Sequence, residues 1–123
     1  MEGFIPFEIA KKLEEKGFKQ DYNIFGYKLI FSDENTIKHI SNIGAYEKGY
    51  FGINIPCPFI SDVLKWLREE KEIMVFPVYS TNTSKWYCSI VNADSLDTYK
   101  LSLSDSYEQA ALAGIEYVLD NLI

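Results

Sequence analysis

Long apolar runs, histidine and cysteine are scarce in this chain of 123 residues. No apolar run approaches the ~20 residues that a membrane-spanning helix needs. No basic-then-apolar stretch follows Met1, so the sequence predicts no secretory signal, and we expect a cytoplasmic protein. Two cysteines in a reducing compartment are expected to be free thiols.

The scarcity of ligand residues also argues against bound ions and cofactors. A single histidine, His39, and two distant cysteines leave a structural zinc site without enough ligands. Asp94 and Asp97 lie in one loop, but the central glycine and closing glutamate of a calcium loop are absent. No glycine is followed by the Lys-Ser/Thr pair of a phosphate-binding loop. We therefore expect no metal and no cofactor.

Acidic residues outnumber basic ones by eighteen to twelve, which gives a net charge of −6. This charge repels phosphate backbones and anionic lipid, so neither a nucleic acid nor a membrane is the expected partner. It suits a basic protein partner, although simple solubility is the more common reason for an acidic composition. Nine tyrosines and eight phenylalanines exceed what a small core requires, and tyrosine favours contact surfaces because it combines apolar area with a polar tip.

Three segments repeat apolar residues at helical spacing, at residues 6–16, 58–71 and 104–122. Pro6 suits the first position of its helix, and Gly17 suits the left-handed position just beyond the end. The last segment carries small residues on its apolar stripe, which allows close approach to a sheet. Its predicted start is a capping box in which an aspartate is followed three residues later by a glutamate.

Strand-like alternation accounts for most of the remaining chain. Residues 73–80 and 85–92 predict a hairpin, in which Pro77 marks an edge strand or a bulge because it lacks an N–H. The expected fold is α+β, one domain over residues 1–123, with helices on one side of a mainly antiparallel sheet of about five strands. The expected order is α-β-β-β-α-β-β-α, and the predicted strands are residues 22–31, 36–40, 51–55, 73–80 and 85–92.

The two cysteines have different surroundings in the sequence. Cys88 shares a strand face with Trp86 and Ile90, which predicts a buried, inert thiol. Cys57 directly precedes the predicted helix 58–71, where a helix dipole stabilises a thiolate. His39 is then the candidate base, and Cys57 with His39 forms a candidate catalytic pair. The plainer interpretation of Cys57 is a small residue at a strand-to-helix junction.

Two stretches predict a contact surface. The segment GAYEKGYFGINIP places Tyr46 and Tyr50 among glycines, where they either form a recognition patch or cover the edge of the core. The predicted edge strand contributes Pro77 and Tyr79. An edge strand can also pair with a second copy of itself, so a homodimer is a further expectation.

Three stretches of the chain resemble a family of small uncharacterised proteins from gut bacteria (Bacteroidetes-like) and their phages. The resembling stretches are IPFEIAKKLEEKGF, PFISDVLKWLREEKEI and YEQAALAGIEYVLDNLI, and the middle one is the most distinctive. The resemblance implies an intracellular or phage-encoded accessory protein. It supplies no catalytic residues, because the matching positions are typical of cores and helix caps.

Two functional hypotheses follow from the sequence. The first is a small acidic, non-catalytic module that binds another protein, with phage or mobile-element origin implied by the resemblance. The alternative is a thiol-dependent enzyme that uses Cys57 with His39, and it requires a thiolate at neutral pH.

Overall fold

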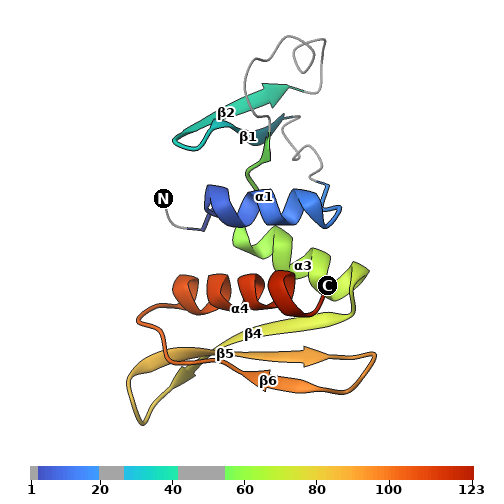
Figure 1. Cartoon of the computed structure of the whole chain (residues 1–123). Coiled ribbons are helices and arrows are strands. Elements are labelled where there is room, and N and C mark those ends of the chain that lie inside the picture. The colour runs from blue at the N-terminus through green and yellow to red at the C-terminus, as the bar shows by residue number, and fades with distance from the viewer. Residues whose placement is uncertain (1–2, 20–26, 42–54) are drawn as a thin grey trace. The chain divides into compact units, whose positions relative to one another are not determined.

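The computed structural model describes residues 3–19, 27–41 and 55–123, and the chain divides into two compact units (Figure 1). The N-terminal unit is Phe4–Pro58, and the C-terminal unit is Phe59–Ile123 together with Met1–Gly3. The described elements are three helices and six strands in two antiparallel sheets, in the predicted order with one extra strand, so the α+β class is confirmed. None of the described helices is long and apolar enough to cross a membrane.

The described part of the N-terminal unit contains one helix and the sheet β2-β1-β3, in which all strands are antiparallel. The helix ends as predicted, because Gly17 has a left-handed φ of +89° and the N–H of Phe18 donates to the carbonyl of Leu13 at 3.0 Å. A turn joins the first two strands, and the Asp33 carboxylate accepts the N–H of Asn35 there at 2.8 Å. The elements are α1 (Phe7–Glu15), β1 (Tyr27–Asp33), β2 (Thr36–Ser41) and β3 (Ile55–Pro56).

Parts of two strands predicted for this unit, residues 22–26 and 51–54, lie outside the described residues. The described remainders, residues 27–31 and residue 55, lie in strands as predicted. The strands extend further than predicted, to Asp33 and to Pro56, and Asp33 was predicted to belong to the turn.

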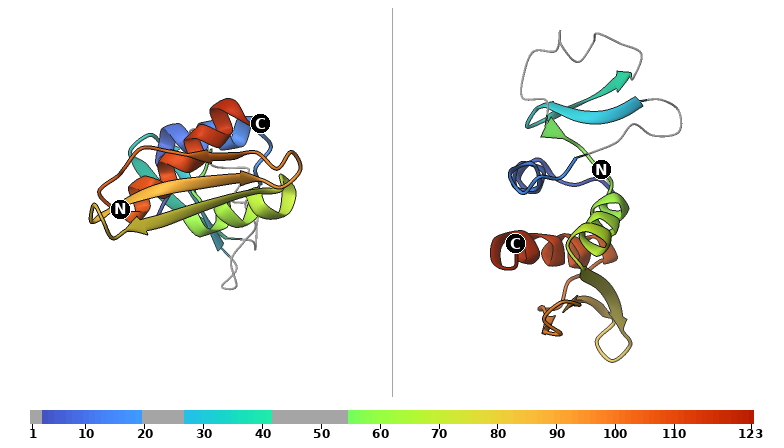
Figure 2. Two further views of the ribbon diagram at one scale, coloured as in Figure 1. Left: turned by 90° about the horizontal axis from the view of Figure 1, so that it is seen from below. Right: turned by 90° about the vertical axis from the view of Figure 1, so that its right-hand side faces the viewer.

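The C-terminal unit contains a three-stranded meander with both of its helices on one side of the sheet (Figures 1 and 2). Helix α4 packs against β4 and β5, and α3 packs against β4 and α4. The hairpin strands have the predicted bounds. The elements are α3 (Ile60–Glu70), β4 (Ile73–Ser80), β5 (Lys85–Asn92), β6 (Thr98–Lys100) and α4 (Tyr107–Asn121).

Strand β6 is absent from the sequence prediction. It has three residues, and Tyr99 is the one aromatic or aliphatic residue among them, so no alternation can be detected over its length. Its position depends on pairing with β5, where Tyr99 lies opposite Ile90.

The two later helices begin at positions that differ from the predicted ones. Helix α3 starts at Ile60, since the N–H of Cys57 still bonds to the neighbouring strand β1 at 3.0 Å and the chain cannot turn into a helix before that pairing ends. Helix α4 is capped by Ser106, whose Oγ accepts the N–H of Gln109 at 3.1 Å. The cap is thus one residue later than the predicted aspartate–glutamate box. A serine oxygen satisfies the free N–H of the first turn in the same way.

The close approach of α4 to the sheet occurs at Gly114, as its small-residue stripe predicts. A Cβ at this position would overlap Sγ of Cys88 and lie 2.8 Å from Cγ1 of Val75. This geometry shows that Val75 of β4 and Cys88 of β5 point toward α4. By strand alternation, the odd-numbered residues of β4 and the even-numbered residues of β5 face the helix.

Candidate functional site

Both thiols are buried and their pKa values are raised. Cys57 and Cys88 are free cysteines with no exposed surface. Burial away from water raises the pKa of each thiol to about 11, and for Cys88 a backbone hydrogen bond from Phe76 opposes this only in part. A neutral thiol is a poor nucleophile, so these surroundings favour a packing role over a catalytic one.

The predicted helix dipole does not act on Cys57 in the way the sequence suggests. Helix α3 begins at Ile60 with Phe59 as its N-cap, so Cys57 lies two residues before the cap. Its own N–H donates to the carbonyl of Leu29 in β1. The free N–H groups of a helix serve the cap and first-turn positions, and the dipole effect falls off within the first turn.

Strand β1 runs between Cys57 and His39. Leu29 has His39 as its register partner on β2, and its carbonyl accepts the N–H of Cys57 from the other side. Neighbouring strands are about 4.8 Å apart, so the backbones of the two residues are roughly 10 Å apart. The side chain of His39 lies outside the described part of the structure. Within that part, no cluster of three or more His, Cys, Asp or Glu residues is arranged to hold a metal.

Of the four predicted binding residues, Tyr46 and Tyr50 lie outside the described residues. Pro77 and Tyr79 lie on β4, an edge strand of its sheet whose register with β5 is continuous. The edge interpretation of Pro77 is therefore correct, and no bulge is needed. By alternation both side chains are on the side of the sheet that faces α4.

The backbone of Pro77 points to the free edge of β4. In an antiparallel pair, the N–H and C=O of one residue point to the same neighbouring strand. Cys88, the partner of Pro77, uses its carbonyl to accept the N–H of Leu101 on the β6 side. Pro77 therefore points away from β5, costs the sheet no hydrogen bond, and removes a donor from the exposed edge.

The second face of this sheet has no described helix of the C-terminal unit over it (Figure 2, left). By strand alternation this face carries apolar side chains. Phe76 is 49% exposed, and its neighbours on this face are half-buried. Lys100 Nζ lies 4.5 Å from the ring centroid of Tyr87. We call this surface the open face, and it consists of Met74, Phe76, Val78, Tyr87 and Val91.

Three aromatic side chains form a second exposed feature, which we call the aromatic cluster: Tyr79, Trp86 and Tyr107. Trp86 stands between the two tyrosines, with ring centroids 5.4 Å from Tyr79 and 5.5 Å from Tyr107 and edge-to-face geometry in both pairs. Tyr79 is 47% and Tyr107 is 40% exposed. Of these three residues, only Tyr79 was predicted as a binding residue. Trp86 lies opposite it in the predicted hairpin, and Tyr107 joins them only in the folded unit, where the start of α4 meets the turn end of the hairpin.

The open face was also missed, although the sequence carries a signal for it. Residues 73–78 read IMVFPV, which is apolar at both odd and even positions. A strand with water on one face alternates, so an unbroken apolar run predicts that both faces are covered in the working protein.

No family model matches the chain, and neither a search of curated proteins nor a search of solved structures finds a match. The candidate sites are therefore assigned from the geometry of the chain itself.

The buried thiols lead to a first testable prediction. In the native protein, Cys57 and Cys88 are expected to react with iodoacetamide at neutral pH roughly a hundredfold more slowly than a cysteine in an unstructured peptide, because a pKa of about 11 leaves far less thiolate. The rate is expected to rise up to about pH 11 instead of levelling near the ordinary thiol pKa. Mass spectrometry of each cysteine-containing peptide after timed labelling measures this.

The sign of the linkage to stability follows from the same pKa values. Each thiol has a higher pKa in the folded state than in the unfolded state. Its contribution to the stability of the folded state is therefore complete below about pH 8.5 and is lost as the pH rises through about 11. Labelling of the unfolded protein in denaturant is the control, and both residues should then react alike. Fast labelling of native Cys57 below pH 7 would instead support the thiol-enzyme hypothesis.

Proposed function

We propose that this protein acts by binding another protein, without catalysis, and that the open face is its docking surface. The observation that carries the proposal is Phe76, which is 49% exposed between Met74 and Val78 on the apolar open face. Contiguous exposed apolar patches that are rimmed by polar residues mark interaction sites on protein surfaces. Lys85 and Lys100 are the charged residues on the same side of the sheet by alternation.

The distribution of exposed apolar side chains supports the same proposal. All the large hydrophobic residues that are exposed in the described part of the chain belong to the C-terminal unit. Burying a phenylalanine ring and its neighbours from water supplies much of the energy of a protein interface. The residues are Phe59, Phe76, Tyr79, Leu96, Leu103 and Tyr107.

The thiol-enzyme alternative receives less support. A thiol with a pKa of about 11 carries almost no thiolate at neutral pH, and β1 separates Cys57 from His39. Two free cysteines are consistent with a cytoplasmic location, which we include in the proposal. Origin from a phage or mobile element rests on the sequence resemblance alone.

A homodimer through β4 is a weaker form of the binding proposal. Its free edge offers backbone groups on either side of Pro77, but Pro77 itself supplies no donor. Edge pairing would therefore be interrupted in its middle, whereas docking on the open face requires no backbone hydrogen bonds.

The proposal is tested by a photo-crosslinking amino acid, benzoylphenylalanine, placed at Phe76. In cells that naturally express the protein, we expect it to attach to one partner protein, which is then identified and purified. Calorimetry should show that Phe76→Ser weakens binding of that protein by about thirtyfold or more, because truncating an aromatic anchor costs about 2 kcal/mol or more.

Matched controls use Lys65, which is exposed on α3. This helix lies on the side of the sheet opposite the open face (Figure 2, left). The crosslinker at Lys65 should not capture the same protein, and Lys65→Ala should leave its affinity unchanged. Equal crosslinking from both positions, or unchanged affinity of a folded Phe76→Ser variant, would refute docking on the open face.

A further inference from the structure

The aromatic cluster has unused binding capacity. Among the described residues, no hydrogen bond involves the indole N–H of Trp86 or the hydroxyls of Tyr79 and Tyr107. Two of the three residues, Tyr79 and Tyr107, are substantially exposed, so another molecule can reach the cluster. Tyrosine and tryptophan in this state are the residues most often found as anchors in protein interfaces.

Other rings of the protein already have a cation over them, and the cluster does not. Lysine ammonium groups lie over Phe7 at 5.1 Å, Trp66 at 5.3 Å and Tyr87 at 4.5 Å from the ring centroids. No such lysine or arginine lies over the cluster within the described ranges of the chain. The nearest basic residue in sequence, Lys85, is instead held by the carboxylate of Asp105 in an ion pair. The π faces of the cluster are thus open to a cation from another molecule.

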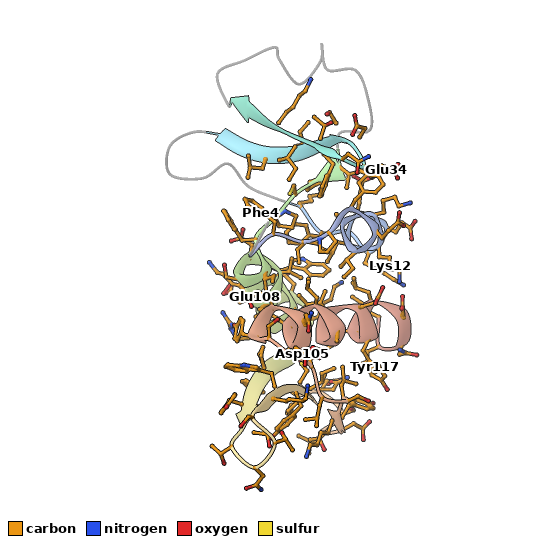
Figure 3. The ribbon with its side chains drawn as sticks, turned by 90° about the vertical axis from the view of Figure 1, so that its left-hand side faces the viewer. Phe4, Lys12, Glu34, Asp105, Glu108 and Tyr117 are labelled. Carbon is orange, nitrogen blue, oxygen red and sulfur yellow. The ribbon has the colours of Figure 1, made fainter. Side chains whose placement is uncertain are left out.

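The charge of the chain is concentrated in the unit that bears the cluster. The C-terminal unit has eleven acidic and five basic residues, whereas the N-terminal unit has seven of each. The C-terminal unit therefore carries the whole net charge of −6. Asp105 and Glu108 lie at the start of α4, next to Tyr107 in the chain (Figure 3). Such a field attracts a basic partner and speeds its approach.

We propose that the aromatic cluster binds an arginine side chain presented by a basic segment of the partner protein. Arginine fits better than lysine, because its planar guanidinium stacks on aromatic rings, is weakly hydrated, and has donors for the tyrosine oxygens. The inference rests on the proposed function and adds the chemistry of the partner. The cluster and the open face lie on opposite sides of β4, at its free edge, so they can be tested separately.

The test uses nuclear magnetic resonance of the full chain, in which the two tryptophans give two indole N–H signals. A short glycine-rich peptide with two arginines is titrated into the protein. We expect a saturable shift of the Trp86 signal and no shift of the Trp66 signal, whose ring already has Lys71 over it. The same peptide with citrulline in place of arginine keeps the shape, removes the charge, and should shift neither signal.

Tyr107→Ala separates ring stacking from general attraction, because it leaves every charge in place. Tyr107→Ala should weaken binding of the arginine peptide by about three- to thirty-fold. Phe76→Ala on the open face should leave the affinity for this peptide unchanged. Equal shifts with arginine and citrulline, or no shift of Trp86, would overturn the inference. Crosslinking from position 76 would still stand in that case, so failure here is distinct from failure of the proposed function.

Discussion

Replacing Ile90 by alanine is expected to lower the free energy of unfolding of the C-terminal unit by about 2–5 kcal/mol. Ile90 lies on the central strand β5, has no exposed surface, and is paired with Val75 on one side and Tyr99 on the other. Truncating its side chain leaves a cavity in the core. Strands β4 and β6 hold β5 in place from both sides, so the backbone cannot move to fill this cavity. A unit of this size has a total stability of only about 3–10 kcal/mol, so the variant approaches the unfolded state.

Urea unfolding followed by tryptophan fluorescence measures this loss, and it reports on the C-terminal unit because both Trp66 and Trp86 belong to it. Ile90→Val should cost less, about 0.5–1.5 kcal/mol. Leu103→Ala removes as many carbons from a half-exposed side chain and should change stability by no more than about 0.5 kcal/mol. Equal effects of Ile90→Ala and Leu103→Ala would contradict a core centred on β5.

The second large effect is expected from Gly114→Ala. Helix propensity alone predicts that alanine stabilises a helix interior by about 1 kcal/mol over glycine. Here the added Cβ would overlap Sγ of Cys88 and press on Val75, so we expect a net loss of about 1–3 kcal/mol. Steric overlap in the core therefore makes Gly114→Ala destabilising, although helix propensity alone predicts a stabilising effect.

The neighbouring position provides a matched control. Ala113 is exposed on the same helix, so Ala113→Gly should follow propensity and cost about 1 kcal/mol. Combining Gly114→Ala with Cys88→Ala removes the overlapping sulfur and should recover part of the loss, as a coupling of about 0.5–3 kcal/mol in a double-mutant cycle. If Gly114→Ala were as stable as the parent in the urea measurement, the close approach of α4 to the sheet would be wrong.

Much of the fold could be predicted from local sequence patterns. The stop at Gly17, the hairpin of residues 73–80 and 85–92 and the apolar stripe of the last helix each depend on neighbours within a few residues. Strand β6 could not be predicted, because three residues are too few to show the alternation of a strand. Its position is fixed by pairing with β5. The partition of the strands into two sheets was missed for the same reason, since pairing partners come from distant parts of the chain.

The candidate sites divide in a similar way. The missing N–H of Pro77 predicted either an edge strand or a bulge, and only the strand order and the continuous register decide for the edge. The aromatic cluster was predictable only in part. Tyr79 and Trp86 lie opposite each other in the predicted hairpin, whereas Tyr107 belongs to a helix that meets the hairpin only after folding. The raised pKa of Cys57 also could not be foreseen, because it arises from burial and depends on what packs around the thiol.

The sequence by itself determined the types of eight of the nine described elements, the bounds of the hairpin strands and the acidic charge, because each depends on spacing or on the chemistry of single residues. Only the tertiary structure decided which sheet face α4 covers, and therefore that Phe76 stays exposed while Cys88 is buried. The physical reason is that both faces of β4 are apolar, so hydrophobicity cannot choose between them. The choice depends on shape, and the contact of Gly114 with Cys88 and Val75 makes it.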